Sequence, residues 1–267
     1  MDPHDTTDTD QKPSGSQQTL SLKEAIDLAI QHHTAGDLSK AEGIYQQILQ
    51  AEPNHPVALH LLGVITHQKG ENERAVDLIS KAIDIKPDYA TAYSNLGNVL
   101  KALGRIKEAI VSYNKALDMN PDFPEPYCNL GNAHHGLRQW DEAVANYQQA
   151  LTIKPDYAEA ASNLGITLQI LGQFNQAVAS YRKSLAVKPD NVEAHFNLGV
   201  IFKNQGMLEE AVSIYQKSIT LNDVDILTGD SSITKESYGS GDSIFVFNKT
   251  VKIDKQEVGD KLSIDDI

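Results

Sequence analysis

The chain has 267 residues, of which 40% are apolar and 22% are charged, a balance typical of a water-soluble globular protein. Its formal net charge of -13 at pH 7 disfavours nucleic acids and anionic membrane surfaces as partners, because both are bound through Lys and Arg side chains. A single cysteine excludes an internal disulfide, and the sequence has neither a signal-peptide pattern nor an apolar run long enough to span a membrane, so we expect a cytoplasmic protein.

Residues 1–20 are polar and acidic, and they are rich in Ser, Thr, Pro, Gly and Gln. Such a segment cannot bury enough apolar surface to offset the entropy lost on ordering, which predicts a disordered N-terminal segment. Ser21 follows, and Glu24 lies three residues further on, which is the spacing of a capping box at the start of a helix.

A period of 34 residues begins at residue 22 and dominates the chain. Three residue types keep the same period, which predicts stacked copies of one supersecondary unit. We place six repeats, at residues 22–55, 56–89, 90–123, 124–157, 158–191 and 192–225, and they cover about three quarters of the chain. The residues that set the period are Gly63, Gly97, Gly131, Gly165 and Gly199, Pro53, Pro87, Pro121, Pro155 and Pro189, and Ala41, Ala75, Ala109, Ala143, Ala177 and Ala211.

Residues 90–123 show the structure expected of one repeat. Leu96 and Leu100 are spaced as on one face of a helix, and Gly104 fits the left-handed residue that ends such a helix. A second helix carries Ala109 on its apolar face and ends before Pro121, which lacks the N–H that a helix interior needs. One helical hairpin cannot bury both of its apolar faces, so neighbouring hairpins must stack. The sequence therefore predicts an all-α, right-handed superhelical solenoid with a concave inner face.

The order of residues within a repeat, aromatic-x2-Leu-Gly, then Ala, Tyr and Pro, resembles the tetratricopeptide repeat, and it is similar to the arrays of O-linked N-acetylglucosamine transferases and of bacterial proteins. Three positions depart from that pattern. Ala29 replaces the glycine in the first repeat, and Arg138 stands at the turn of the fourth. Asp223 replaces the proline of the sixth repeat, so the last helix has no such stop signal.

Residues 226–267 leave the period. Ile244 and Val246, and then Val251 and Ile253, alternate with polar neighbours, which predicts a short β segment, either a hairpin or a pair of strands that needs a partner. This tail does not resemble the polar helix that usually caps a tetratricopeptide array. The sixth repeat would then expose an apolar end, which makes self-association through that repeat an alternative.

The resemblance implies that the first helix of each repeat lines the concave groove. Its sixth position carries asparagine in four successive repeats, and a carboxamide both donates and accepts hydrogen bonds, so it can pair with the backbone of an extended peptide. This arrangement is similar to the asparagine ladder of the O-linked N-acetylglucosamine transferases. The alternative is that these side chains brace neighbouring repeats. The candidate groove residues are Asn95, Asn129, Asn163 and Asn197 of the ladder, with Asn98, Asn132, Lys101, His135 and Lys203 beside them.

The sequence offers no catalytic, metal-binding or cofactor-binding motif. The adjacent histidines at 32–33 and 134–135 diverge on a helix, and Cys128 has only His135 near it as an activating base. We therefore expect a scaffold or adaptor that binds an extended segment of a protein partner, and not an enzyme. Two alternatives are the substrate-recruiting part of a larger or truncated glycosyltransferase or methyltransferase, and a self-assembling scaffold.

Overall fold

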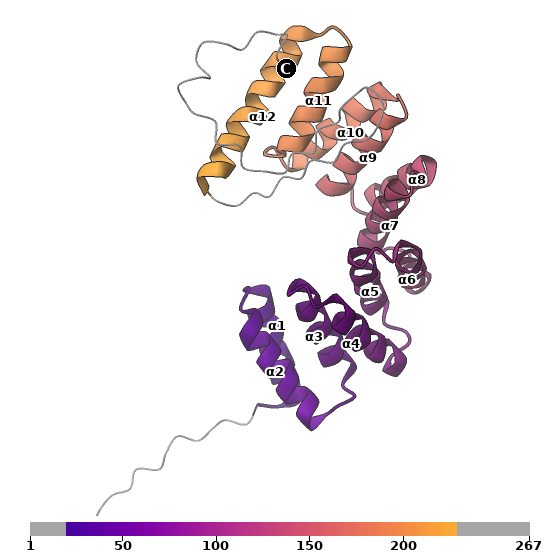
Figure 1. The fold of residues 1–267 in the computed structure, drawn as a ribbon, viewed down its shortest axis with the longest axis vertical. Helices are drawn as coiled ribbons and strands as arrows, with labels where there is room; N and C mark the ends of the chain where they lie inside the picture. Colours follow the sequence, from indigo (N-terminus) through magenta and orange to yellow (C-terminus); the bar gives the residue numbers. More distant parts are fainter. Residues whose placement is uncertain (1–19, 229–267) are drawn as a thin grey trace, which may run out of the picture. The chain divides into compact units, whose positions relative to one another are not determined.

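A computed structural model of the chain describes residues 20–228, with side chains as far as residue 221. This part of the chain contains twelve α-helices and no strand (Figure 1). The described helices group into two compact units that divide between residues 112 and 113, within helix α6 (Ile106–Met119). The expectation of an all-helical repeat array is confirmed, whereas the predicted N-terminal disorder and the predicted β segment lie outside the described residues.

The first unit is built from antiparallel helical pairs. Its first helix begins at a capping box, as predicted: the Ser21 N–H donates to Glu24 Oε2 at 2.8 Å, and the Glu24 N–H donates to Ser21 Oγ at 3.3 Å. Contacts join α1 to α2, α2 to α3, α3 to α4, and α4 to α5. The helices are α1 (Leu22–Thr34), α2 (Leu38–Ala51), α3 (Pro56–Gln68), α4 (Asn72–Ile85) and α5 (Ala90–Ala102).

The second unit repeats the same pairing. Contacts join α7 to α8, α8 to α9, α9 to α10, α10 to α11, and α11 to α12. The last helix has 21 residues, against 14 in α8 and α10, so the expected loss of a stop signal at Asp223 is confirmed. The helices are α7 (Pro124–Gly136), α8 (Trp140–Ile153), α9 (Ala158–Ile170), α10 (Phe174–Val187), α11 (Val192–Asn204) and α12 (Leu208–Thr228). Among the described residues, no helix is long and apolar enough to cross a membrane.

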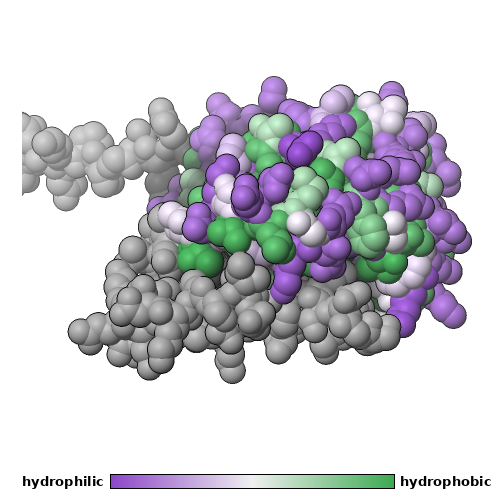
Figure 2. All heavy atoms as spheres, turned by 90° about the horizontal axis from the view of Figure 1, so that it is seen from above, coloured by the Kyte–Doolittle hydropathy of each residue, from purple (hydrophilic) through white to green (hydrophobic). Residues whose placement is uncertain are grey.

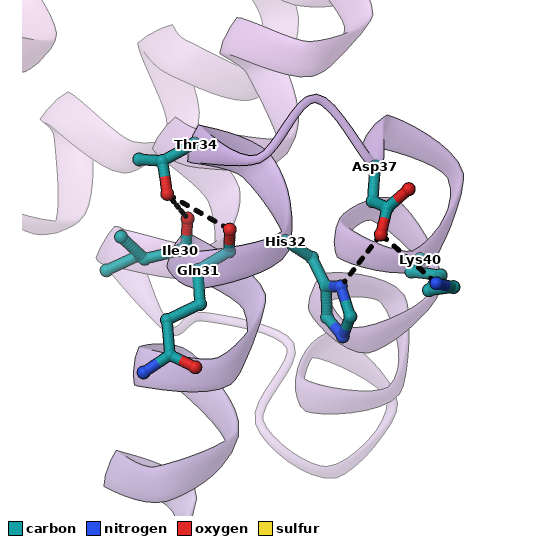
Figure 3. Close-up of polar contacts among 6 residues, drawn as sticks. All are labelled: Ile30, Gln31, His32, Thr34, Asp37 and Lys40. Atoms are coloured by element: carbon teal, nitrogen blue, oxygen red, sulfur yellow. Dashed lines mark hydrogen bonds and ion pairs between the residues drawn. The ribbon is translucent and has the colours of Figure 1, made fainter.

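The turn between α1 and α2 shows how a hairpin reverses direction (Figure 3). The Thr34 hydroxyl donates to the carbonyl oxygens of Ile30 and Gln31, each at 3.0 Å, and the Ala35 N–H donates to the Gln31 carbonyl oxygen as well, so the last turn of α1 is doubly bonded. Beyond the turn, Lys40 Nζ donates to the Asp37 carboxylate at 3.1 Å at the start of α2. Local polar contacts therefore close this turn on both sides.

A left-handed residue follows the first helix of the repeat at six equivalent turns. Five of these residues are glycines with φ between 72° and 83°, which confirms the prediction made from their spacing. The sixth is Arg138, whose φ of 59° is the only positive value at a non-glycine residue in the described part of the chain. The fourth repeat therefore keeps the turn geometry of the others although a side chain disfavours it.

Within a hairpin, the two helices meet at a glycine and a large side chain. A Cβ atom on Gly165 would lie 2.6 Å from the ring of Tyr181, which is itself wholly buried. A Cβ atom on Gly131 would lie 2.5 Å from the ring of Tyr147 in the same way. Glycine recurs at this position because a Cβ atom would overlap the facing side chain in these hairpins, whereas the first repeat holds a wholly buried alanine, Ala29, at the equivalent place.

We predict that Gly165→Ala lowers the free energy of unfolding by about 1–3 kcal/mol, because the added methyl group overpacks the contact with Tyr181. Gly43→Ala is the matched control, since a Cβ atom there would meet nothing within 4 Å and alanine favours the interior of α2. Urea denaturation followed by circular dichroism measures both. Equal stability of the two variants would show that the close approach does not limit packing.

We predict that Arg138→Gly raises the free energy of unfolding by up to about 1 kcal/mol, because the left-handed strain it relieves exceeds the entropy that glycine gains in the unfolded chain. The reverse change, Gly172→Ala, should lower it by about 1 kcal/mol, since Gly172 has φ +72°. Thermal unfolding compares the two variants with the native chain. A lower melting temperature for Arg138→Gly would mean that the arginine side chain stabilises the turn.

Candidate functional site

In the second unit, one asparagine of the predicted ladder bonds to the preceding repeat. Asn163 on α9 donates from Nδ2 to Asn132 Oδ1 on α7 at 2.8 Å, and the Tyr147 hydroxyl on α8 donates to the same oxygen at 2.7 Å. The three side chains thus link two neighbouring hairpins through one acceptor. Because an amide side chain has two N–H donors and one carbonyl oxygen, Asn163 keeps further hydrogen-bonding capacity after this bond is made.

In the first unit, Asn95 takes part in a different, partly buried chain of hydrogen bonds. Its Nδ2 lies 2.8 Å from His60 Nε2, and His60 Nδ1 lies 2.9 Å from the Tyr89 hydroxyl. Because the amide N–H donates to Nε2, the imidazole carries its proton on Nδ1 and donates to the tyrosine oxygen. The His60 ring also packs edge-on against the Tyr89 ring, with centroids 4.8 Å apart.

Burial keeps this histidine neutral. The side chain of His60 is 1% exposed, and desolvation lowers its pKa from 6.5 to about 4. Burial also raises the pKa of the Tyr89 hydroxyl, so both partners stay uncharged at neutral pH. Sequence analysis did not single out His60 or Tyr89, which are the fifth and the last residues of the second repeat.

Asn197 on α11 is the exception in the ladder. Its side chain is wholly buried, and neither Nδ2 nor Oδ1 has a hydrogen-bond partner. Burial raises the pKa of the Tyr181 hydroxyl well above its usual value, and the nearby Asn197 carboxamide opposes part of this rise. The carboxamide atoms are nevertheless not aligned for a hydrogen bond with that hydroxyl. That hydroxyl donates instead to Gln169 Oε1 at 3.0 Å.

The preceding repeat explains why Asn197 has no partner. The place that Asn132 holds in the fourth repeat, one turn after the ladder residue, is taken in the fifth by Ile166, which offers no acceptor. Ser162, also on α9, has a buried hydroxyl without a partner. Buried polar groups without partners are rare in folded proteins, and each one asks for an explanation such as a bound water or a ligand.

The other predicted groove residues divide between the two units. Lys101 and Asn98 lie half-buried on α5, in the same unit as Asn95. In the second unit, Asn129 and His135 are half-buried on α7, and Lys203 is half-buried on α11. The His135 ring packs edge-on against Trp140, with centroids 4.9 Å apart.

Two surface hollows of the second unit, of about 370 and 340 Å³, lie away from the ladder. The first is formed mainly by residues 172–176, in the turn after α9 and the first turn of α10, and the second by residues of α8, α9 and α10. Neither is lined by any of the predicted groove residues. Within the described part of the chain, no group of three or more His, Cys, Asp or Glu side chains could hold a metal ion, and Cys128 is buried.

Stacked helical hairpins joined through a polar ladder define the class of protein as a helical repeat array. A family model described as TPR repeat matches residues 63–104, 97–137 and 169–206. Three further models, each described as tetratricopeptide repeat, match residues 124–157, 146–179 and 192–225. Together these matches span residues 63–225, more than half of the chain, and the chain therefore belongs to the tetratricopeptide repeat family.

Solved structures share this fold at low sequence identity. The crystal structure of MamA is 23% identical, with a TM-score of 0.58 over 62% of this chain and 97% of that one. PilF of Pseudomonas aeruginosa is 18% identical, with a TM-score of 0.68 over 78% of this chain and 92% of that one. YrrB, described as a TPR protein with an unusual peptide-binding site, is 23% identical, with a TM-score of 0.55 over 68% of this chain and 94% of that one. No curated protein sequence matches the chain.

We predict that acid destabilises the first unit through His60. The folded state binds this proton only near pH 4, whereas the unfolded state binds it below about pH 6.5, so stability is complete above pH 6.5 and falls as the pH drops toward 4. The loss between pH 7 and pH 4.5 should be about 2–3 kcal/mol.

His60→Gln cannot titrate and is the matched comparison. Urea-denaturation curves of the native chain and this variant, at about pH 7 and about pH 4.5, separate the contribution of His60 to the free energy of unfolding from that of the carboxylates. The native chain should lose about 2–3 kcal/mol more than the variant. An equal loss in both would show that His60 is not the group that couples folding to pH.

Proposed function

We propose that this chain is a protein-interaction scaffold whose second unit binds an extended peptide along its inner helices α7, α9 and α11. Membership of the tetratricopeptide repeat family supports a protein-interaction role in general. The observation that carries the finer proposal is Asn197, whose buried carboxamide keeps both its donor and its acceptor unused. A peptide backbone offers the complementary pair, one C=O and one N–H per residue.

The spacing of the ladder suits an extended chain. Helices α7 and α9 contact each other, and packed helices lie about 8–10 Å apart. An extended peptide advances about 3.3 Å per residue, so one step of the ladder corresponds to about three residues of ligand. Asn163 and Asn197 would then pair with backbone groups about three residues apart, which makes the contact independent of the side chains between them.

The charges of the inner helices favour a basic peptide. Each of α7, α9 and α11 carries a glutamate in its first turn, at 125, 159 and 193. Glu193 is largely enclosed, and burial raises its pKa, so a Lys or Arg side chain beside it would relieve the cost of its negative charge. The two hollows described above are not lined by these glutamates, and so they give no support to a small-molecule site beside them.

For the peptide to reach Asn197, its carboxamide must become accessible. The atoms are wholly covered in the free protein, so we expect binding to turn the Asn197 side chain or its neighbours outward. The cost of that movement is reduced because the buried carboxamide gives up only its interaction with the nearby Tyr181 hydroxyl when it turns. Asn163 is less suited to move, since it would leave Asn132.

We predict that Asn197→Leu separates binding from stability. Leucine removes the unpaired polar groups from the interior and should raise the free energy of unfolding by about 1–2 kcal/mol, while it weakens peptide binding at least tenfold. The probe is the tightest binder from an immobilised library of lysine-containing peptides of about ten residues, which exceeds the roughly six residues that the two ladder steps from Asn129 to Asn197 span. Isothermal titration calorimetry gives the affinity, and urea denaturation gives the stability.

Asn146→Leu is the matched control, because Asn146 lies half-buried on α8, which is not one of the proposed binding helices, and its Nδ2 donates to the Glu142 carbonyl oxygen. It should leave peptide affinity unchanged. If Asn197→Leu binds the peptide as tightly as the native chain, the ladder is a brace between repeats and the proposal is wrong.

A further inference from the structure

Two apolar positions on the second helix of a repeat are covered by the first helix of the next. In the first unit, Val76 and Ile83 of α4 pack in one cluster with Ala92 and Leu96 of α5. In the second unit, the equivalent side chains of α8, Val144 and Leu151, pack in one cluster with Ala160 and Leu164 of α9. Where these repeats are followed by another, the second position is buried, since Ile83 is 8% exposed and Leu151 is 9% exposed, and the first, Val76 or Val144, is half-buried.

The same two positions are open on α12. Val212 is 38% exposed and Ile219 is 48% exposed, although Tyr215 between them is only 7% exposed. Val212 and Ile219 are seven residues apart, so they lie on one face of the helix, two turns from each other. Hydrophobic surface patches are visible on the face seen from above in Figure 2. In the part of the chain that the structure describes, no further helix follows α12 to cover them.

The internal interfaces specify what fits this face. In each repeat after the first, the residue that meets the preceding repeat is a small one in the first turn, and a leucine follows four residues later on the same side of the helix. All of these small residues are buried. The pairs are Ala58 and Leu62, Ala92 and Leu96, Pro126 and Leu130, Ala160 and Leu164, and Ala194 and Leu198.

The first helix of the chain itself does not fit the open face. Glu24 stands on α1 where the later repeats have the buried Ala or Pro, and its carboxylate is exposed and tied to Ser21. If α1 of a second copy seated on α12, that carboxylate would be buried without a positive partner. Head-to-tail stacking of identical copies is therefore disfavoured, and a heterologous partner fits better.

We propose that the exposed face of α12, formed by Val212 and Ile219, is a docking site for an amphipathic helix of another polypeptide. That helix carries a small residue in its first turn and a leucine four residues later, so that it continues the interface which the chain repeats internally. The site is separate from the inner helices, and it therefore does not depend on peptide binding at Asn197.

The test uses the full chain and a fluorescent synthetic peptide with the sequence of residues 158–171, which spans α9 and carries Ala160 and Leu164. Saturable binding, measured by fluorescence anisotropy, is expected for the native chain. Two changes should each weaken it at least tenfold: Ile219→Lys in the chain, and Ala160→Glu in the peptide, which copies the glutamate of α1. Val212→Lys is a second variant of the same face, in case Ile219→Lys fails to fold.

Two controls test whether the peptide binds at the exposed face of α12. Val111→Lys changes an apolar side chain that is 55% exposed on α6 and should leave helix binding unchanged. Asn197→Leu should also leave it unchanged, so failure of the docking site and failure of the peptide groove can be told apart. Circular dichroism checks that each variant remains helical.

Three results would overturn the proposal. One is equal binding by the native chain and by folded variants of Ile219 and Val212. Another is a dimer in light scattering that Ile219→Lys dissociates, which would make a second copy the occupant. The third is binding that appears only when the chain is ended at residue 228, which would mean that residues 229–267 already fill the site.

Discussion

Each hairpin of the second unit depends on the contact between a residue without a side chain on its first helix and an aromatic ring on its second. The distance from Gly165 to the Tyr181 ring leaves no room for a Cβ atom, and the ring is wholly buried. This contact sets the separation of the two helices and therefore the direction in which their other faces point. The remaining apolar faces can be buried only by a neighbouring repeat, so stacking follows from the geometry of a single hairpin.

Stacking then decides the chemistry of the polar ladder. The same position of the repeat has a different environment in each of three described cases: Asn95 meets His60, Asn163 meets Asn132, and Asn197 meets no partner. The difference comes from the preceding repeat, which supplies a hydrogen-bonding side chain in the first two cases. A ladder that looks uniform along the sequence is thus partly a brace between repeats. Among these three asparagines, Asn197 is the one whose Nδ2 and Oδ1 have no hydrogen-bond partner.

Because each apolar face needs a neighbouring repeat to cover it, the two ends of the array differ from each other. A charged residue, Glu24, replaces the small buried residue on the first helix, so that end is closed to a further repeat. The last helix keeps the apolar side chains that an additional helix would cover, and Val212 and Ile219 are exposed. The two described ends of the array therefore differ: the first helix carries a charged residue where later repeats have a small buried one, and the last helix exposes two apolar side chains.

Sequence alone was sufficient for the helical hairpins, the capping box at Ser21, the left-handed turns and the extended last helix, because each of these depends on backbone preferences within a few residues. It could not decide whether the asparagines brace or bind. That outcome depends on side chains 31 to 35 residues away in the chain, such as Asn132 and His60, which only the stacked structure brings within hydrogen-bonding distance. A hydrogen bond forms over about 3 Å, so it is decided by the neighbour that tertiary packing supplies and not by the period of the repeat.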